Sequence, residues 1–188
     1  MTTDVKVRLR EKRLADAAAD YAWKTDAELS ELDAAPQLGI SFQHYLAEYL
    51  RELRHPSSDR ERFAIETLDG KHIGNCTYYG INRAKGEAEV GIIIGDRDYW
   101  GKGYGASAMN ALTSHIFQNT KLNRLYLKTL ASNIRAQKCF AKCGFAQYGR
   151  AARDGYDFIL MELPRDRWQQ LQKADKSSAG ILKGSETS

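Results

Sequence analysis

The chain has 188 residues, of which 43% are hydrophobic and 28% are charged, and its formal net charge is +4. This length and composition predict one globular domain and exclude wholesale disorder and a fibrous protein. The sequence has no long apolar run and no apolar signal segment at its start, so we expect no membrane partner and no secretion.

Charge and cysteine content exclude further classes. From residue 164 onward the chain holds five Lys or Arg and three Asp or Glu, which leaves the rest nearly balanced. A nucleic-acid-binding protein usually concentrates more positive charge, so we expect no nucleic-acid partner. The three cysteines, Cys76, Cys139 and Cys143, are too few for a disulfide framework, and no histidines accompany them at ligand spacing. We therefore expect a cytoplasmic protein without a metal site.

The first half of the chain predicts a strand, two helices and an antiparallel meander. Ser41 is a good cap for the second helix, and Asp69-Gly70 between two strand-like runs is typical of a hairpin. In chain order we expect a strand at 5–9, a helix with Leu14, Ala18 and Tyr21 on its apolar face, a loop at 25–39 with room for a short helix, a helix from Ser41 to His55, and strands at 63–67, 73–79 and 87–94.

The second half returns to helical periodicity. In chain order we expect a helix after Gly105, a strand at 125–127, a helix capped by Ser132 or Asn133 and ended by Gly144, and two strands around 153–155, the last ending at Pro164. This order predicts a mixed α/β sheet rather than a doubly wound one. We expect residues 1–165 to form the domain and residues 166–188 to be a polar, disordered tail.

The most informative segment is the glycine-rich loop at 100–106, which follows an apolar strand and opens a helix. Its glycines allow the backbone to approach a ligand closely. The free N–H groups and the dipole of the helix start favour a phosphate there, and Lys102 adds a positive charge. The loop therefore predicts a phosphate-binding site, although a glycine-rich turn that only caps a helix would look the same.

Two common phosphate motifs do not fit this loop. A Walker A loop fails because five residues separate Gly95 from Gly101 and because Gly103, not Ser or Thr, follows Lys102. A dinucleotide-binding fingerprint fits poorly because an antiparallel meander precedes the loop and the next strand leads to Lys128 instead of an acid.

The loop instead resembles the [QR]-x-x-G-x-[GA] segment of the GNAT superfamily of acyl-CoA-dependent N-acetyltransferases. Gly103 and Gly105 stand at its glycine positions, and Trp100 replaces the usual Gln or Arg, as in the Rim-type branch. Residues 133–145 resemble a second family segment, N-x-x-A-x-x-x-[YF]-x-K-x-G-F, which begins 28 residues after Gly105. Together the two segments identify residues 5–163 as similar to GNAT enzymes, with the Rim-type and spermidine acetyltransferases as the nearest branches.

The resemblance implies a single GNAT-like α/β (α+β) domain, in which acetyl-CoA, the co-substrate, lies between a splayed pair of parallel strands of a mostly antiparallel sheet. The backbone at 92–94 would pair with the pantetheine arm and polarise the thioester carbonyl. The pyrophosphate would lie against 101–106, Asn133 would bind the pantetheine, and Arg135 would reach a phosphate or simply face solvent. The implied cofactor-binding residues are Ile92, Ile93, Ile94, Trp100, Gly101, Lys102, Gly103, Tyr104, Gly105, Ala106, Asn133, Ile134 and Arg135.

The chemistry that the resemblance implies requires a base. An alkyl ammonium has a pKa of about 10.4 and must lose a proton before its nitrogen can attack. Glu89 stands at the family's base position, although a solvent-facing strand Glu would give the same pattern. Phe140 stands where many relatives have Tyr, so the usual general acid is missing, and Tyr148, Tyr156 or solvent remain as proton donors. A thiol with a pKa of about 8.5 leaves tolerably as thiolate, so the acid is helpful and not obligatory.

The resemblance implies direct transfer of acetyl from acetyl-CoA to a primary amine, such as a protein N-terminus, a polyamine or another small amine, in a ternary complex. Phe140 motivates an alternative, a catalytically silent acyl-CoA-binding module that acts as a sensor or scaffold. Family analogy further implies a homodimer. Acidic side chains near the first helices and the last hairpin would suit a cationic acceptor: Glu28, Glu31, Asp33, Asp154 and Asp157.

Overall fold

The computed structural model describes residues 4–182, with side chains up to residue 174, and its frame is one mixed sheet. The strand order is β1-β2-β3-β4-β5-β7-β6, and β4–β5 is the parallel pair among antiparallel neighbours. This confirms the predicted mixed, mostly antiparallel sheet. The strands are β1 Val7–Glu11, β2 Arg60–Thr67, β3 His72–Asn82, β4 Glu87–Ile94, β5 Arg124–Leu130, β6 Ala146–Arg153 and β7 Tyr156–Pro164.

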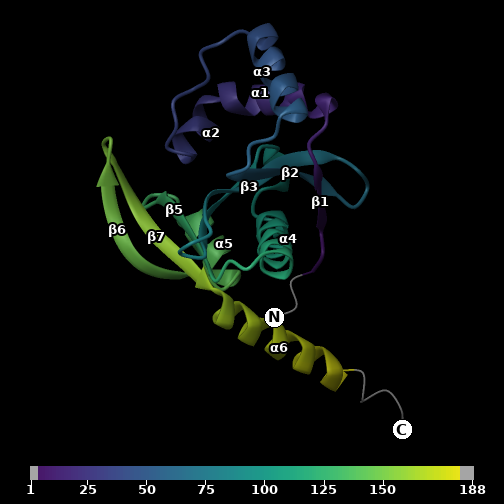
Figure 1. Ribbon diagram of the computed structural model, residues 1–188, viewed down its shortest axis with the longest axis vertical. Coiled ribbons are helices and arrows are strands. Elements are labelled where there is room, and N and C mark those ends of the chain that lie inside the picture. Colours follow the sequence, from purple (N-terminus) through teal and green to yellow (C-terminus); the bar gives the residue numbers. More distant parts are fainter. Residues whose placement is uncertain (1–3, 183–188) are drawn as a thin grey trace.

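Helices cover both faces of the sheet, as Figure 1 shows. Helix α4 lies against one face, while α1–α3 form a group at one end of the molecule and α6 projects at the other. The long β6–β7 hairpin curves along one side. The helices are η1 Leu14–Asp16, α1 Ala17–Thr25, α2 Ala27–Leu32, α3 Phe42–Arg54, η2 Arg97–Tyr99, α4 Tyr104–Asn119, α5 Ile134–Lys142 and α6 Arg165–Leu182. No helix within residues 4–182 is long and apolar enough to cross a membrane.

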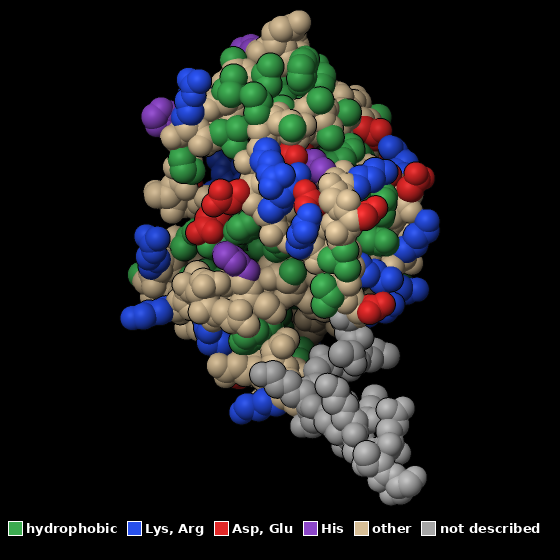
Figure 2. Space-filling model, turned by 90° about the vertical axis from the view of Figure 1, so that its right-hand side faces the viewer, with side chains coloured by type: hydrophobic (Ala, Val, Ile, Leu, Met, Phe, Trp, Pro, Cys, Tyr) green, Lys and Arg blue, Asp and Glu red, His purple; other side chains and the backbone are tan. Residues whose placement is uncertain are grey.

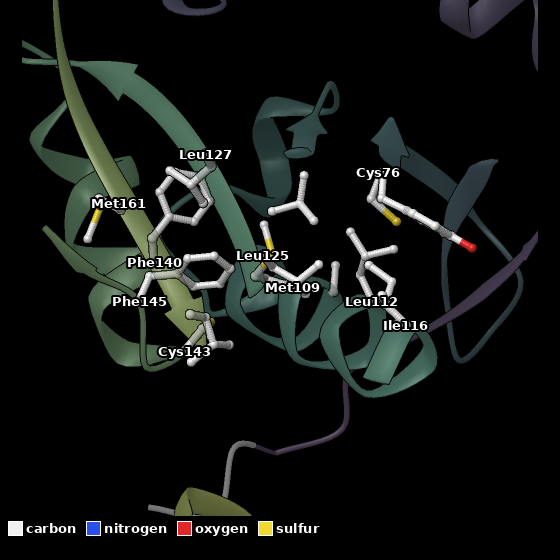
Figure 3. Close-up of a cluster of buried hydrophobic side chains, with 14 of the residues drawn as sticks. Cys76, Met109, Leu112, Ile116, Leu125, Leu127, Phe140, Cys143, Phe145 and Met161 are labelled. Carbon is white, nitrogen blue, oxygen red and sulfur yellow. The ribbon is translucent and has the colours of Figure 1, made fainter. Parts of the chain in front are cut away.

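The main core lies between α4, α5 and the inner face of the sheet. The apolar stripe of α4 is fully buried at Leu112 and Ile116, which pack toward β5 and β3 (Figure 3). Phe140 of α5 meets Phe145 with ring centroids 6.2 Å apart. Because the stripe recurs every three to four residues, burial on one face is what holds α4 against the sheet.

The parallel strands β4 and β5 pair over only three residues. Their register runs from Glu87 with Arg124 to Glu89 with Tyr126, and no pair follows, although β4 continues to Ile94. The facing edge of β4 beyond Glu89 is therefore unpaired with β5. This gives the splay that the resemblance implied.

The first helix buries only part of the predicted face. Tyr21 packs against the cluster of Tyr45 and Tyr49, but Leu14 and Ala18 are exposed, and the fully buried positions are Asp16, Ala17 and Asp20. The two acids are buried because cations meet them: Arg10 binds Asp16 with N···O distances of 2.8 Å. Although burial acts in the opposite direction, the hydrogen bond from Arg10 lowers the pKa of Asp16 to about 2. On the face of the molecule that carries β1 and β2, basic and acidic side chains are interspersed (Figure 2).

The prediction of a disordered tail from residue 166 onward is wrong up to residue 182, because residues 165–182 form helix α6. The Arg165 guanidinium donates to the carbonyls of Leu122 at 2.7 Å and Thr120 at 2.8 Å. Trp168 packs on Phe117 with ring centroids 5.2 Å apart. These contacts join distant parts of the chain, so the polar composition of the segment does not reveal them. Residues 183–188 of the expected tail lie outside the described part.

Candidate active site

A cavity of about 530 Å³ lies beside the free end of β4. It is enclosed by β4, the glycine-rich loop, α5 and α2. The predicted cofactor-binding residues line it, except Lys102 and Tyr104. Lys102 is exposed on the loop, and Tyr104 turns away, with its ring 4.8 Å from that of Tyr99 and 5.6 Å from the Lys6 ammonium. The structure thus brings two sequence segments together around one cavity, with Lys102 and Tyr104 outside its lining.

The glycine-rich loop needs its glycines. Gly101 and Gly103 have φ angles of 72° and 86°, a left-handed conformation that other residues adopt at a cost. Gly103 is the N-cap of α4 and no side chain caps this helix start, so its first N–H groups are available to a ligand. A Cβ on Gly105 would lie 3.4 Å from the Cys139 sulfur, an ordinary contact distance, so the requirement for glycine is at Gly101 and Gly103.

Trp100 organises the wall of this cavity. Its indole Nε1 donates to the carbonyl of Ile94 at 2.6 Å, which fixes the ring at the end of β4. The Arg135 guanidinium carbon lies 3.7 Å from the centroid of that ring, a cation–π contact. Lys138 and Lys142 line the same cavity. This concentration of positive charge suits an anionic ligand.

Helix α5 begins and ends as the sequence predicts. The Asn133 side-chain oxygen accepts a hydrogen bond from the Ala136 N–H at 3.1 Å, so Asn133 is the cap. Cys139 lines the cavity and Cys143 is buried. A hydrogen bond with Cys143 lowers the pKa of Cys139 below that of an ordinary thiol.

A second cavity, of about 600 Å³, lies between α1, α2 and the face of β2, β3 and β4. It shares Leu29, Asp33, Ile92 and Ile93 with the first cavity. The two cavities therefore adjoin along β4, and these residues form part of the wall of each.

Glu89 is the last residue of the β4–β5 pairing and stands at the point where the two strands diverge. Its carboxylate lies 3.6 Å from the Lys128 ammonium, and its side chain is 16% exposed. It lines neither cavity directly, but its cross-strand neighbour Tyr79 and its strand neighbour Gly91 line the second one. Glu89 therefore lies beside the second cavity, three residues before Ile92 on β4.

Sequence reasoning missed Tyr79. Burial and the neighbouring Glu89 carboxylate raise the pKa of Tyr79, so its phenol keeps its proton at neutral pH. Tyr148 and Tyr156, the donors suggested from the sequence, line neither cavity, and Tyr148 lies 5.0 Å from the Arg124 guanidinium instead. Alternation along β3, which buries Cys76 and Tyr78 on the opposite face, was the signal for Tyr79.

The acidic side chains expected around an acceptor are mostly elsewhere. Asp33 lines both cavities, whereas Glu28, Glu31, Asp154 and Asp157 line neither. Glu28 and the neighbouring Asp26 bind Arg97, each with an N···O distance of 2.8 Å. These pairs attach α2 to the segment just before the glycine-rich loop.

Comparison with known proteins points to one family. The family model described as "Acetyltransferase (GNAT) domain" matches residues 6–146. The uncharacterized N-acetyltransferase p20 of Bacillus licheniformis is 26% identical over 146 residues, which cover 77% of this chain and 81% of the relative. The aminoglycoside N(6')-acetyltransferase type 1 of Serratia marcescens is 23% identical over 172 residues, which cover 84% and 83%.

The fold matches solved structures over nearly their whole length. A spermidine N-acetyltransferase from Vibrio cholerae, in complex with CoA and spermine, superposes with a TM-score of 0.80 at 20% identity, covering 88% of this chain and 99% of that one. The two chains therefore share a fold.

Proposed function

The chain belongs to the acetyltransferase (GNAT) family, and on this basis we propose that it transfers acetyl from acetyl-CoA directly to a primary amine in a ternary complex. The observation that carries the proposal is the junction of the two cavities over Ile92 and Ile93. A thioester in the first cavity and an amine in the second would meet there. Relatives named for spermidine and aminoglycosides support an amine acceptor, and family membership does not favour the silent module.

The first cavity is proposed to hold acetyl-CoA. The pantetheine arm would pair with the free edge of β4 at 92–94, because β5 leaves that edge beyond Glu89. The pyrophosphate would lie against the N–H groups at 101–106, and the Arg135 guanidinium would bind a phosphate. Asn133 and Ile134, which line the same cavity, would contact the pantetheine.

The proposed reaction has two bond changes. The amine nitrogen attacks the thioester carbonyl carbon, and the carbon–sulfur bond then breaks to release CoA as thiolate. The amine proton passes to Glu89, directly or through a bound water. A backbone N–H of 92–94 would stabilise the oxyanion that forms between the two steps. Phe140 lines the first cavity and has no hydroxyl group, so it does not protonate the thiolate, and solvent supplies this proton.

A thermal melt with and without saturating acetyl-CoA tests the proposed cofactor. A ligand at 100 times its Kd stabilises a protein by about 2.7 kcal/mol, which raises the melting temperature of a chain this long by roughly 5–10 °C. We expect this shift, and we expect Gly103→Val to abolish it because valine does not adopt the φ of 86° at this position. A wild-type protein that melts cooperatively without any shift would contradict the proposal.

Two further proposals concern the state of the protein. Family analogy supports a homodimer, which sedimentation equilibrium would test. The free cysteines within the described residues, two of them buried, suit a reducing cytoplasm.

A further inference from the structure

If the chain acetylates an amine as proposed above, we infer that its acceptor also carries a carboxylate, which Arg60 and Arg62 bind in the second cavity. Four cations line this cavity, Lys12, Lys24, Arg60 and Arg62, together with three carboxylates, Asp20, Asp33 and Asp59. A site for a polycation would need carboxylates free to meet it. Which of these charges are free therefore decides the acceptor class.

The buried carboxylate of the second cavity is already satisfied. Asp20 accepts hydrogen bonds from the Lys12 ammonium at 2.7 Å, the Asn75 amide at 2.7 Å and the Tyr49 hydroxyl at 3.1 Å. Its side chain is 4% exposed. A cationic acceptor would have to displace Lys12 from a buried pair, which is costly. Asp20 is therefore part of the cavity floor and not a binding group for an amine. Asp59 accepts a hydrogen bond from the Ser57 hydroxyl at the surface, and Asp33, which lines both cavities, remains to meet the amine of the acceptor beside β4.

The two arginines of β2, in contrast to Asp20, are available to a ligand. No residue in the described range pairs with the exposed Arg60 guanidinium, and Arg62 pairs with Glu52 at the surface, where both side chains are at least one-third exposed. Such surface pairs are weak, so Arg62 can turn to a ligand at little cost. A guanidinium binds a carboxylate through two parallel hydrogen bonds, which is the interaction these side chains can offer.

The sheet register places Arg60 in line with the proposed reaction centre. Arg60 is paired with Tyr79, and Tyr79 is paired with Glu89, so the three form one row across β2, β3 and β4. Strands lie about 4.8 Å apart, so the Cα atoms of Arg60 and Glu89 are on the order of 10 Å apart. The two residues between a terminal amine and the Cα of the third residue span about 7 Å when extended, and a Glu side chain reaches further, so a carboxylate on the third residue extends from β4 toward β2.

The geometry thus favours an acceptor whose amine lies over β4 while its carboxylate lies over β2. The N-terminus of an acidic peptide has this arrangement, and a polyamine or an aminoglycoside, which carries several positive charges, does not. The second cavity therefore suits a different acceptor from spermidine and the aminoglycosides, for which the relatives are named.

Three tripeptide amides with one primary amine each test the inference: Ala-Gly-Glu, Ala-Gly-Gln and Ala-Gly-Arg, with spermidine as a fourth acceptor. The release of CoA from acetyl-CoA gives kcat/KM for each. For the wild type we expect the Glu peptide to exceed the Gln peptide by about tenfold and the Arg peptide to be the poorest of the three. Arg60→Glu is expected to reverse the order of the Glu and Arg peptides. Arg167→Glu, an exposed arginine on α6 at the opposite end of the molecule, is the matched control and should leave the order unchanged.

The outcomes separate the inference from the proposed function. Equal kcat/KM for the Glu and Gln peptides, or a preference for spermidine that Arg60→Glu leaves unchanged, would overturn the carboxylate inference and keep the transferase. No turnover on any of the four acceptors would overturn both. Since Arg60 is exposed and unpaired among the described residues, the variant should melt at the wild-type temperature, which excludes misfolding as the cause of a changed order.

Discussion

The buried pair between Lys12 and Asp20 supports a quantitative prediction, because it forms the floor of the cavity proposed for the acceptor. Their side chains are 10% and 4% exposed and their charged atoms are 2.7 Å apart. Removing one partner of a buried pair typically costs about 3–5 kcal/mol. Asp20→Asn keeps the shape of the side chain and removes its charge. Because Asp16 lies 3.9 Å from the Lys12 ammonium and compensates in part, we expect the lower end, about 3 kcal/mol.

Urea denaturation of both proteins measures this loss, and a thermal melt should show a decrease of roughly 6–12 °C for a chain of this size. Burial lowers the pKa of Lys12, while the Asp20 charge opposes that shift. Without Asp20 the pKa should fall further, so the unfolded state binds more protons than the folded state at alkaline pH and stability then rises with pH. The deficit of the variant should therefore shrink as the pH rises toward the pKa of an unfolded lysine.

The double variant Lys12→Met with Asp20→Leu provides the control, since an apolar pair of similar volume often replaces a buried ion pair at little cost. We expect it to recover only part of the lost stability, because the Asn75 amide and the Tyr49 hydroxyl lose the acceptor that Asp20 provides. A loss below about 1 kcal/mol for Asp20→Asn, or a deficit that does not change with pH, would show that the pair is not the buried ion pair described here.

The remaining predictions concern the proposed site and α6. Glu89→Gln should lower kcat by about 10²–10⁴-fold and leave the Kd for acetyl-CoA unchanged, and an unchanged kcat would remove Glu89 as the base. Arg135→Ala should weaken acetyl-CoA binding about two- to fivefold by titration calorimetry, whereas Arg150→Ala, which lines neither cavity, should not. Trp168→Ala should lower the free energy of unfolding by about 2 kcal/mol because the contact with Phe117 is lost, and a truly disordered segment would show no change.

Local patterns account for the elements that sequence analysis predicted well. The strand at 87–94 agrees with β4 at both ends, because a turn with Gly86 precedes it and its side chains alternate. Asn133 caps α5 and Gly144, with a φ of 94°, follows its end, as their residue types indicate. Each of these signals depends on a few neighbouring residues, which is why the sequence is enough to recognise them.

Long-range pairs explain what sequence analysis missed. The first helix was predicted to bury Leu14, Ala18 and Tyr21. Tyr21 is partly buried, yet η1 and α1 bury the acids Asp16 and Asp20 instead of Leu14 and Ala18, because the partners of these acids come from β1 and β3. Helix α6 was predicted as disordered because the residues that hold it, such as Phe117, lie far away in the sequence. A hydropathy pattern does not register such partners, since it assigns every charged residue to the surface.

The sequence by itself determined the family resemblance, the mixed sheet and about half of the residues that line the first cavity, because glycine conformations, caps and strand alternation are local properties. The tertiary structure alone decided which charges in the second cavity are free. The pairing of Lys12 with Asp20 and of Arg97 with Asp26 joins residues from different elements, so Asp20 is already occupied, whereas Arg60 in the same cavity has no ion pair within the described residues. The sequence gives the number of charged residues, but only the tertiary structure shows which of them neutralise one another in ion pairs.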